Sequence, residues 1–378
     1  MSLLLNQLSK LCFQKPVLVR SSPVLPNNGF STSLTQTPPC SIICAEPCGA
    51  DLGKLVIWNA TESKYTHLEK KVPLELVDKD VTITIGSSHG WVATLEDDSS
   101  IVRLQDDLNP VASDKDPKRV FLPPLVTLPH CQTKVVTNVA MSSSSPEDED
   151  CVVAIKFLGP QLSFCRPAQS NPEWINIAIE NPCFFSSPVM FSNKDDIMLS
   201  IPGSGGHLIG SWDLHKHSKN PKLQSLRFQN LPKLTKAKRD LLDSCYASEH
   251  LVESRTTSET FLVKRYKKTV KIFKGIVKMK TEFLMVFKID EQGNAVFTQD
   301  IGGLVIFLSK SEPFCVPASS FSGMSSNGVR VLDVDESANV SLDRYQRCII
   351  HSTIYRDGLG APYHIPPQKK KTNSWDLS

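Results

Sequence analysis

Two glycine-rich stretches are the first candidates for chemistry, because glycine loops bind phosphate groups through their backbone N–H groups. In the stretch GSSHGWVATL, neither Gly86 nor Gly90 is followed by the Lys-Ser or Lys-Thr pair of a Walker A loop. The residues after Gly90 read as a strand, whereas a phosphate-binding loop leads into a helix. The second stretch, GSGGHLIG at 203–210, lacks the G-x-G-x-x-G spacing. Both stretches therefore predict hairpin turns.

Histidine and cysteine clusters are the next candidates, because these side chains bind zinc. His215 and His217 in the stretch DLHKH would share one face of a strand, but no third ligand is evident. Cys40, Cys44 and Cys48 follow a C-x3-C-x3-C spacing, with no histidine and no second cysteine pair nearby. The sequence thus predicts no metal site and no cofactor.

Signatures of catalysis do not occur in the sequence. The motifs G-x-S-x-G and H-E-x-x-H and the protein-kinase set are missing. Asp106 and Asp107 form a carboxylate pair, but they lie in a predicted turn and are interpreted as solvated charge. We therefore expect a protein that is not an enzyme, with no evident small-molecule substrate.

One basic run, KRYKKTVKIFKGIVKMK at 264–280, carries eight lysine and arginine residues and no acid. A basic hairpin with interleaved aromatic rings can bind a phosphate backbone and stack bases. The simpler interpretation is a solvated hairpin or an interaction loop, which is the usual role of a contiguous charge run. The candidate contacts to nucleic acid or to a partner protein are Lys264, Arg265, Tyr266, Lys267, Lys268, Lys271, Phe273, Lys274, Lys278 and Lys280.

Composition places the chain among globular proteins. Of its 378 residues, 40% are hydrophobic, enough for a core, and 21% are charged. No run of about 18 apolar residues occurs, so we expect no membrane insertion. The chain has 42 basic and 39 acidic residues, and residues 1–30 hold three of the basic ones and no acid. The remainder is neutral, so its net charge does not indicate a nucleic-acid partner.

Short strands separated by turns dominate the rest of the chain. The runs WVATL, IVRL, CVVAIKF and LVIFLS are examples, each rich in strand-forming residues. About twenty such strands are too many for one flat sheet, whereas four-stranded blades repeated around an axis accommodate them. No WD or kelch repeat recurs at a fixed period. The predicted fold is therefore an all-β propeller of degenerate four-stranded blades, with a pair of jelly rolls as the alternative.

The N-terminal segment has the composition of an organelle transit peptide. Residues 1–45 contain no acid, are rich in serine, and begin with an amphipathic pattern that Pro16 ends. The stretch NNGFSTS resembles the mitochondrial pattern of Arg, any residue, an aromatic and Ser, with Asn28 in the place of Arg. We expect a disordered leader directed to the mitochondrion, cleaved near Phe30, with the chloroplast as second choice.

Five separated motifs resemble a plant family in the right order. They are GSSHGWVATLEDDSSIVRLQDDLNP followed by VFLPPLVTLP, then TKVVTNVAMSSSSPEDEDCVVAIKF, LSFCRP, TEFLMVFKID and IGGLVIFLS. The family is the F-box-associated plant family called domain of unknown function 295, whose domain is a KIB-type β-propeller. The resemblance covers roughly residues 50–335 and implies that 86–110 is a blade hairpin; the face shared by Trp91, Ala93 and Leu95 would pack against the next blade.

The F-box that many members carry before the propeller is not recognisable here, because residues 35–60 are short and rich in proline. The resemblance points to an organelle-directed branch. We expect a transit peptide at 1–30, a linker at 31–50, the propeller at 51–365 and a disordered tail at 366–378.

The predicted function is that of a non-enzymatic mitochondrial β-propeller that binds an unknown protein partner. The alternatives are an organellar RNA-binding protein that uses the hairpin 264–280, and an F-box-type ubiquitin-ligase substrate adaptor if the F-box is only apparently lost.

Overall fold

The structure is a computed structural model, and it describes the following residues: 36–78, 84–96, 99–129, 131, 133, 135–192, 198–215, 220–273, 276–342, 349–352 and 360–369. All of them belong to the second of the chain's two units, Thr32–Ser378, and the first unit is Met1–Ser31. The predicted transit peptide at 1–30 lies outside the described residues.

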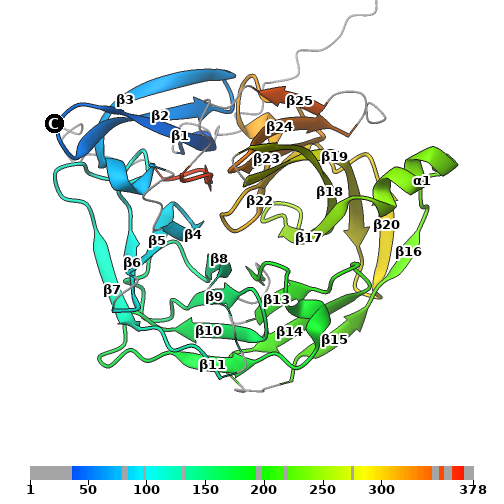
Figure 1. Cartoon of the computed structure of the whole chain (residues 1–378), viewed down its shortest axis with the longest axis horizontal. Helices are drawn as coiled ribbons and strands as arrows, with labels where there is room; N and C mark the ends of the chain where they lie inside the picture. The colour runs from blue at the N-terminus through cyan, green and yellow to red at the C-terminus, as the bar shows by residue number, and fades with distance from the viewer. Residues whose placement is uncertain are drawn as a thin grey trace, which may run out of the picture. The chain divides into compact units, whose positions relative to one another are not determined.

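The described strands form six sheets that follow one another around a central space (Figure 1). The fold is a six-bladed β-propeller, so the predicted all-β propeller is confirmed. We number the sheets blades 1 to 6 along the chain. Blades 1 to 4 have four strands each, as predicted, and blades 5 and 6 have five.

The strands of each blade, in the order in which they are paired, are as follows. Blade 1 consists of β26 (His364–Ile365), β1 (Cys40–Pro47), β2 (Leu52–Asn59) and β3 (Lys64–Pro73). Blade 2 consists of β4 (Thr84–Ser88), β5 (Trp91–Leu95), β6 (Ile101–Gln105) and β7 (Arg119–Pro124). Blade 3 consists of β11 (Ile175–Ala178), β10 (Gln161–Cys165), β9 (Val153–Phe157) and β8 (Val136–Met141).

The second half of the ring is less regular. Blade 4 consists of β12 (Met190–Phe191), β13 (Met198–Pro202), β14 (Leu208–Asp213) and β15 (Lys222–Ser225). Blade 5 consists of β17 (Tyr246–Glu253), β18 (Thr260–Phe273), β19 (Ile276–Ile289), β20 (Asn294–Thr298) and β16 (Arg227–Gln229). Blade 6 consists of β22 (Phe314–Pro317), β21 (Leu304–Leu308), β23 (Gly328–Asp333), β24 (Glu336–Ser341) and β25 (Ile349–Ser352).

One α-helix, which the sequence pattern did not predict, precedes β17 in the described part of the chain. Helix α1 spans Lys236–Asp243, and the hydroxyl of its N-cap residue Thr235 accepts a hydrogen bond from the N–H of Lys238 at 3.3 Å. The described residues also form three short 3-10 helices, η2 (Leu74–Leu76), η3 (Pro182–Phe184) and η4 (Ala318–Ser320). Among the described residues, no helix is long and apolar enough to cross a membrane.

The apolar core lies between neighbouring blades. Five clusters of buried side chains each draw on two adjacent sheets. A sixth cluster joins blade 6 to Ala60, the residue that follows β2 of blade 1. Between blades 2 and 3, Trp91 and Ala93 are buried against Val139 and Val153, and Leu95 packs beside them. The predicted packing of the Trp91 face against the next blade is therefore confirmed.

The stretch that opens with Gly86 is a hairpin, as predicted. Strands β4 and β5 pair from Ser88 and Trp91 outward, so only His89 and Gly90 form the turn. Both turn residues have positive φ, 51° for His89 and 89° for Gly90, which is the type I′ turn that matches the twist of paired strands. The glycine loop thus serves to reverse the chain.

Blade 1 is completed by the C-terminal strand β26, which pairs with β1. The side chains of Ser41 and His364 hydrogen bond at 2.8 Å, and the N–H of Thr37 donates to the carbonyl of Gln368 at 2.8 Å. The predicted boundaries need correction in both places. Strand β1 lies in the predicted linker 31–50, and Gln368 of the predicted tail 366–378 is bonded, because closing the ring requires strands from both ends of the chain.

We expect Ile365→Ala to destabilise the protein by about 2–5 kcal/mol, because Ile365 is 1% exposed in the cluster shared by blades 1 and 2. Leu52→Ala in the same blade is the control, since Leu52 is 42% exposed, and it should change stability by less than about 0.5 kcal/mol. Urea unfolding measures both. Equal effects would show that β26 does not close the ring.

Candidate functional site

The edge strands of three blades, β4, β8 and β12, carry residues that hydrogen bond to one carboxylate, that of Glu312. Two of these strands, β4 and β8, lie towards the centre of the ring in Figure 1. Glu312 lies in the connection from β21 to β22, and its backbone N–H donates to the Ser87 carbonyl at 2.8 Å. Its Oε2 accepts from Ser88 Oγ at 2.6 Å, and its Oε1 accepts from the N–H of Phe191 at 2.9 Å. Ser88 Oγ in turn accepts from the N–H of Met141 at 3.1 Å. One side chain of blade 6 therefore ties together blades 2, 3 and 4.

The surroundings of Glu312 shift the protonation of two groups. Burial raises the pKa of Glu312 to about 7, although the hydrogen bonds that it accepts oppose this shift. Burial and the charge of Arg255 lower the pKa of His89 to about 4, so its ring is neutral at pH 7. Arg255 Nη2 lies 3.3 Å from His89 Nε2, which fits a hydrogen bond donated by the guanidinium to the neutral ring.

A thiol follows Glu312 closely in the sequence, at Cys315, but it is not a reactive one. Cys315 of β22 donates its S–H to the carbonyl of Glu253 at 3.6 Å. Burial raises the pKa of the Cys315 thiol to about 12, and a protonated thiol is neither a good nucleophile nor a metal ligand. The arrangement around Glu312 has the chemistry of a structural junction.

Lys156 is the other buried group whose pKa invites a chemical role. Burial lowers its pKa to about 7, which is the range of lysines that act as nucleophiles. Its side chain is fully buried, and Nζ donates to the carbonyls of Phe157, Gly159 and Phe185, the last two at 3.0 Å. Every N–H of the ammonium group is used, so Lys156 fixes the connection between blades 3 and 4.

The stretches considered for metal binding do not assemble a site in the described part of the chain. His215 is exposed at the end of β14, and His217 lies outside the described residues. Cys40 is buried in β1, whereas Cys48 is exposed just beyond it. Within the ranges that the structure describes, no group of three or more His, Cys, Asp and Glu could hold a metal ion.

The predicted basic hairpin is the turn from β18 to β19, and its inner half is built into the propeller. Lys264 Nζ donates to the Gly205 carbonyl at 2.9 Å. Arg265 is 5% exposed and pairs with Asp333 at 3.1 Å and with Glu336 at 2.7 Å. These two cations join blade 5 to its neighbours on either side, so neither is available to a partner.

Tyr266 and Lys267 are also committed to the fold. The Tyr266 ring packs edge to face against Phe283 at a centroid distance of 6.0 Å. Lys267 Nζ lies 3.5 Å from the Asp333 carboxylate and 5.4 Å from the centre of the Tyr246 ring. The run 264–280 is therefore not one continuous basic surface, because a strand buried on both faces places its first basic residues in interfaces between blades.

The outer half of the hairpin extends beyond the sheet. Pairing of β17 with β18 ends at Lys267, and pairing of β19 with β20 reaches only to Val286. Within the described residues, 268–273 and 276–280 pair only with each other. We call residues 268–280 the ribbon; of the candidate contacts, Lys274 lies in it but outside the described residues.

One face of the ribbon carries lysines, and we call it the lysine face. Lys268 lies opposite Lys280, and Lys278 lies two residues from Lys280 on the same strand, so the three side chains share a face. Lys271 is paired with Lys278, and Phe273 is the last residue of β18. Lys268 is exposed, and Lys278 and Lys280 are half-buried.

The opposite face of the ribbon is apolar. Ile272 lies opposite Val277, and Met279 is two residues further along β19. Ile272 is 67% exposed and Val277 is 46% exposed. Val270, at the bulge in β18, is exposed as well. The alternation gives a two-sided ribbon with positive charge on one face and exposed aliphatic side chains on the other.

Helix α1 lies on the same side of blade 5 as the lysine face. Lys238 Nζ is 4.5 Å from the centre of the Phe283 ring, on the side of blade 5 that packs against blade 4. The pKa of the Cys245 thiol is raised chiefly by burial and also by Glu282, while Lys268 and Lys238 lower it. Both cations therefore act on one point at the root of the ribbon.

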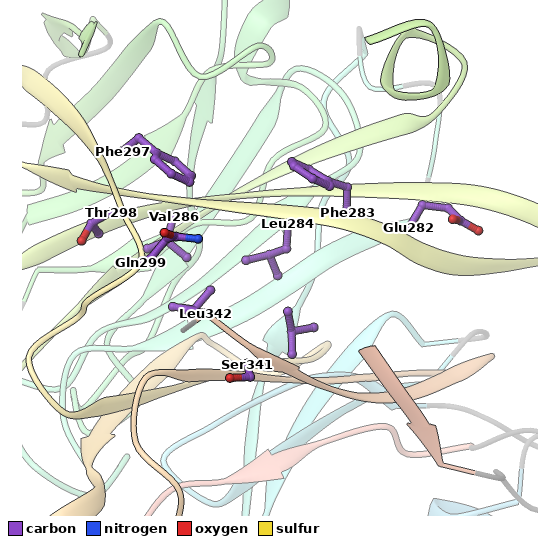
Figure 2. Close-up of a pocket in the computed structure, with 10 residues that line it drawn as sticks. Glu282, Phe283, Leu284, Val286, Phe297, Thr298, Gln299, Ser341 and Leu342 are labelled. Carbon is purple, nitrogen blue, oxygen red and sulfur yellow. The ribbon is translucent and has the colours of Figure 1, made fainter. Parts of the chain in front are cut away.

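A small crevice opens at the root of the ribbon, between β19 and the end of β24 (Figure 2). Leu284 and Val286 line it from blade 5, and Leu342 from blade 6. Thr298 and Gln299, where β20 ends, form its rim. The volume of about 30 Å³ is an order of magnitude below that of pockets for small molecules, but it can take the tip of a side chain.

Sequence reasoning found the ribbon but missed the crevice. It also missed the structural junction around Glu312, which we call the axial junction. Glu312 stands alone in the stretch SKSEPF and matches no motif. Its partners Ser88, Met141 and Phe191 are far from it in the chain. Only the circular arrangement of the blades brings these residues together, so no local signal could have revealed them.

We expect the wild-type protein to have a higher free energy of unfolding than Glu312→Gln at about pH 5. This difference should fall by about 1–2 kcal/mol by about pH 7.5, after allowance for solvent screening. Burial raises the folded-state pKa of Glu312 from 4.5 to about 7. Its contribution is therefore fully present below the unfolded value and is lost as pH rises through the folded value. Urea unfolding at the two pH values measures the change.

Glu259→Gln is the matched control for this test. The hydrogen bond from Lys288 holds the pKa of Glu259 below its ordinary value. Its carboxyl is then ionised in both folded and unfolded states above about pH 5, so its stability difference from wild type should stay constant. A constant difference for Glu312→Gln as well would contradict the burial of the axial carboxyl.

Comparison with solved structures finds proteins of low sequence identity. The Cps50 (Swd1) β-propeller domain of Myceliophteria thermophila is 8% identical, with a TM-score of 0.33, and the match covers 77% of this chain and 88% of that one. The periplasmic gluconolactonase PpgL of Pseudomonas aeruginosa is 9% identical, with a TM-score of 0.33, and the match covers 87% and 98%. Likenesses at this level do not indicate a function.

Comparison with families gives a defined result. No curated protein matches the chain. The KIB1-4 beta-propeller family matches residues 57–354, a span that runs from β2 to beyond β25 and includes the axial junction and the ribbon. This chain therefore belongs to the KIB1-4 β-propeller family.

Proposed function

We propose that this protein is a non-enzymatic, mitochondrial protein-binding module whose partner contacts the ribbon of blade 5. The observation that carries the proposal is the exposure of Val270, Ile272 and Val277, which are 49%, 67% and 46% exposed on an element that pairs only with itself among the described residues. Clustered aliphatic side chains on a projecting strand pair mark surfaces that a partner covers.

The propeller supports this role as a rigid scaffold. Arg265 and Thr281 at the root of the ribbon are bound to Glu336 of blade 6, with Arg265 Nη2 at 2.7 Å and the Thr281 N–H at 2.9 Å. Both are buried, and a buried, fully bonded charge holds one geometry. The ribbon is therefore presented in a fixed direction, which lowers the entropy lost on binding.

RNA is the second candidate partner, and the lysine face of the ribbon favours it. Lys268, Lys278 and Lys280 project from one face and could neutralise phosphates. A protein partner accounts for more of the surface, because RNA phosphates gain nothing from the apolar face. In addition, Lys264, Arg265 and Lys267 already have partners within the fold.

The mitochondrial part of the proposal rests on residues 1–30, which hold three basic residues and no acid. A cytosolic ubiquitin-ligase adaptor is the competing assignment, and it requires an F-box. The two assignments differ in the compartment where a partner should be sought.

We expect the full chain to enter isolated mitochondria and to be shortened to a product that begins near Ser31. N-terminal sequencing of the imported protein measures this. A chain that lacks residues 1–30 is the control and should stay outside. A full chain that remains in the cytosol in cells would overturn the mitochondrial assignment and favour the adaptor function.

We expect the double substitution Ile272→Ser and Val277→Ser to weaken partner binding by at least about tenfold, since each removes buried apolar contact in the complex. Chemical cross-linking in mitochondrial extract, followed by mass spectrometry, measures it. Leu223→Ser on blade 4 is the matched control, because Leu223 is 54% exposed. Loss of the same partner from both variants would place the contact elsewhere.

RNA binding is tested on the same protein by filter binding to a uridine oligonucleotide. If RNA is the partner, Lys278→Glu with Lys280→Glu should abolish binding, and wild-type affinity should fall steeply with salt. Unchanged binding by this variant would exclude the ribbon as an RNA contact.

A further inference from the structure

Strand β19 has an open edge that continues the line of β20. Strand β20 pairs with β19 only from Val286 to Ile289. Towards the ribbon, Lys278–Thr281, Phe283 and Leu284 of β19 pair with β18 on one side, and Glu282 is left out of the pairing at a bulge. In the described part of the chain no strand covers their other side. An open strand edge presents N–H and C=O groups to an incoming strand. On this edge the N–H of Thr281 is already bound by Glu336 of blade 6 at 2.9 Å, so an added strand would pair with the residues on either side of Thr281.

The crevice lies at the start of this edge. Figure 2 shows Phe297, Thr298 and Gln299 at the point where β20 ends, with Leu284 and Leu342 beside them. A strand that continued the line of β20 would begin here. Its first side chain on the blade 6 side would meet the aliphatic walls of the crevice, which are too close together to take a larger ligand.

The two faces of the open edge differ in what they would accept. Thr281 hydrogen bonds to Glu336 of blade 6, so this face of β19 continues into Met279 and Val277 of the apolar face. The alternate residues Lys280 and Lys278 lie on the other face. Along 277–280, before the bulge at Glu282, an incoming strand therefore has every second side chain beside aliphatic groups and the others beside ammonium groups.

We propose that the edge of β19 from Lys278 to Leu284 takes an extended segment of a partner protein as an additional strand, and that this segment alternates acidic and apolar residues. The inference deepens the proposed function, on which it rests, by naming the recognised chemistry. Main-chain hydrogen bonds supply affinity in this mode, and the alternation of side chains supplies specificity.

The lysines also exclude the simplest competing occupant, a second copy of this chain. Two ribbons paired edge to edge would place Lys278 and Lys280 of one copy beside the same lysines of the other copy. Like charges on neighbouring strands destabilise pairing. Residues 1–45, which contain no acid, cannot complement the lysine face either. The positive face thus rejects basic strands and accepts acidic ones.

The test uses the full chain and three labelled peptides of about nine residues, measured by fluorescence anisotropy at about 0.15 M salt. The first alternates Glu and Val, the second has the same composition in two blocks, and the third alternates Lys and Val. We expect the alternating acidic peptide to bind at least about tenfold more tightly than the block peptide, and the Lys peptide not to bind. Equal binding of the two acidic peptides would show attraction of a polyanion only and would overturn the strand model.

Charge reversal checks the face assignment. The double variant Lys278→Glu and Lys280→Glu should no longer bind the Glu-Val peptide and should bind the Lys-Val peptide instead. A variant that had failed to fold would not acquire this new binding. Lys222→Glu with Lys233→Glu is the matched control, since both lysines are exposed and lie outside the ribbon, and it should retain the wild-type preference. No gain of the Lys-Val peptide would overturn the proposal.

Backbone pairing has its own readout. In a strand, alternate N–H groups point to the same side. Two methylated forms of the Glu-Val peptide are compared, one with the backbone nitrogens of its odd residues methylated and one with those of its even residues methylated. One of the two forms should fail to bind, and the other should bind almost as tightly as the unmethylated peptide. Equal effects of the two patterns would rule out strand addition.

The outcomes for the two proposals remain separable. If no peptide binds but the Ile272→Ser and Val277→Ser variant still loses its cross-linked partner, the ribbon is a protein contact and strand addition is wrong. A uridine oligonucleotide that displaces the Glu-Val peptide and binds more tightly would assign the lysine face to RNA.

Discussion

The structure depends on satisfying the inner edges of its blades. Each blade of a propeller ends at the axis in a strand with a free edge, and buried backbone groups without partners are costly. In blade 4, the Glu312 carboxylate accepts a hydrogen bond from the Phe191 N–H. It also accepts one from the Ser88 hydroxyl of blade 2, which in turn accepts one from the Met141 N–H of blade 3. Asn138 does the same between blades 3 and 4, since its amide exchanges two hydrogen bonds with the backbone of Val189. Side chains take the role that a further strand has elsewhere in the sheets.

Blades 5 and 6 are joined by charge as well as by apolar packing. Arg265 reaches across to Asp333 and Glu336, and Thr281 donates to the same Glu336 carboxylate through both its N–H and its hydroxyl. Replacing one member of such a buried network leaves a charge unpaired, which is strongly destabilising. The network lies where β18 and β19 leave the sheet, so the interaction that joins the two blades also sets the direction of the ribbon.

The strand pattern was predictable because local chemistry decides it. The turn at His89 and Gly90 and the alternation of Trp91 and Ala93 indicated a hairpin with one face in a core, and the fold has both. The closing strand β26 was not predictable, because His364 and Ile365 are a two-residue strand with no pattern of its own. Its pairing with β1 is decided by the ring, which brings the two ends of the propeller sequence together.

The basic run 264–280 shows what could not be predicted from the sequence alone. Composition determined that 264–280 is a long, positively charged hairpin, because strand-forming residues and lysines alternate without an acid. Which of its charges face a partner was decided only by tertiary structure. Arg265 is buried against Glu336, whereas Lys268 is exposed just beyond the point where the pairing of β18 with β17 ends. The physical reason is that a residue's type fixes what it can bind, while its depth in the sheet decides whether the fold has already bound it.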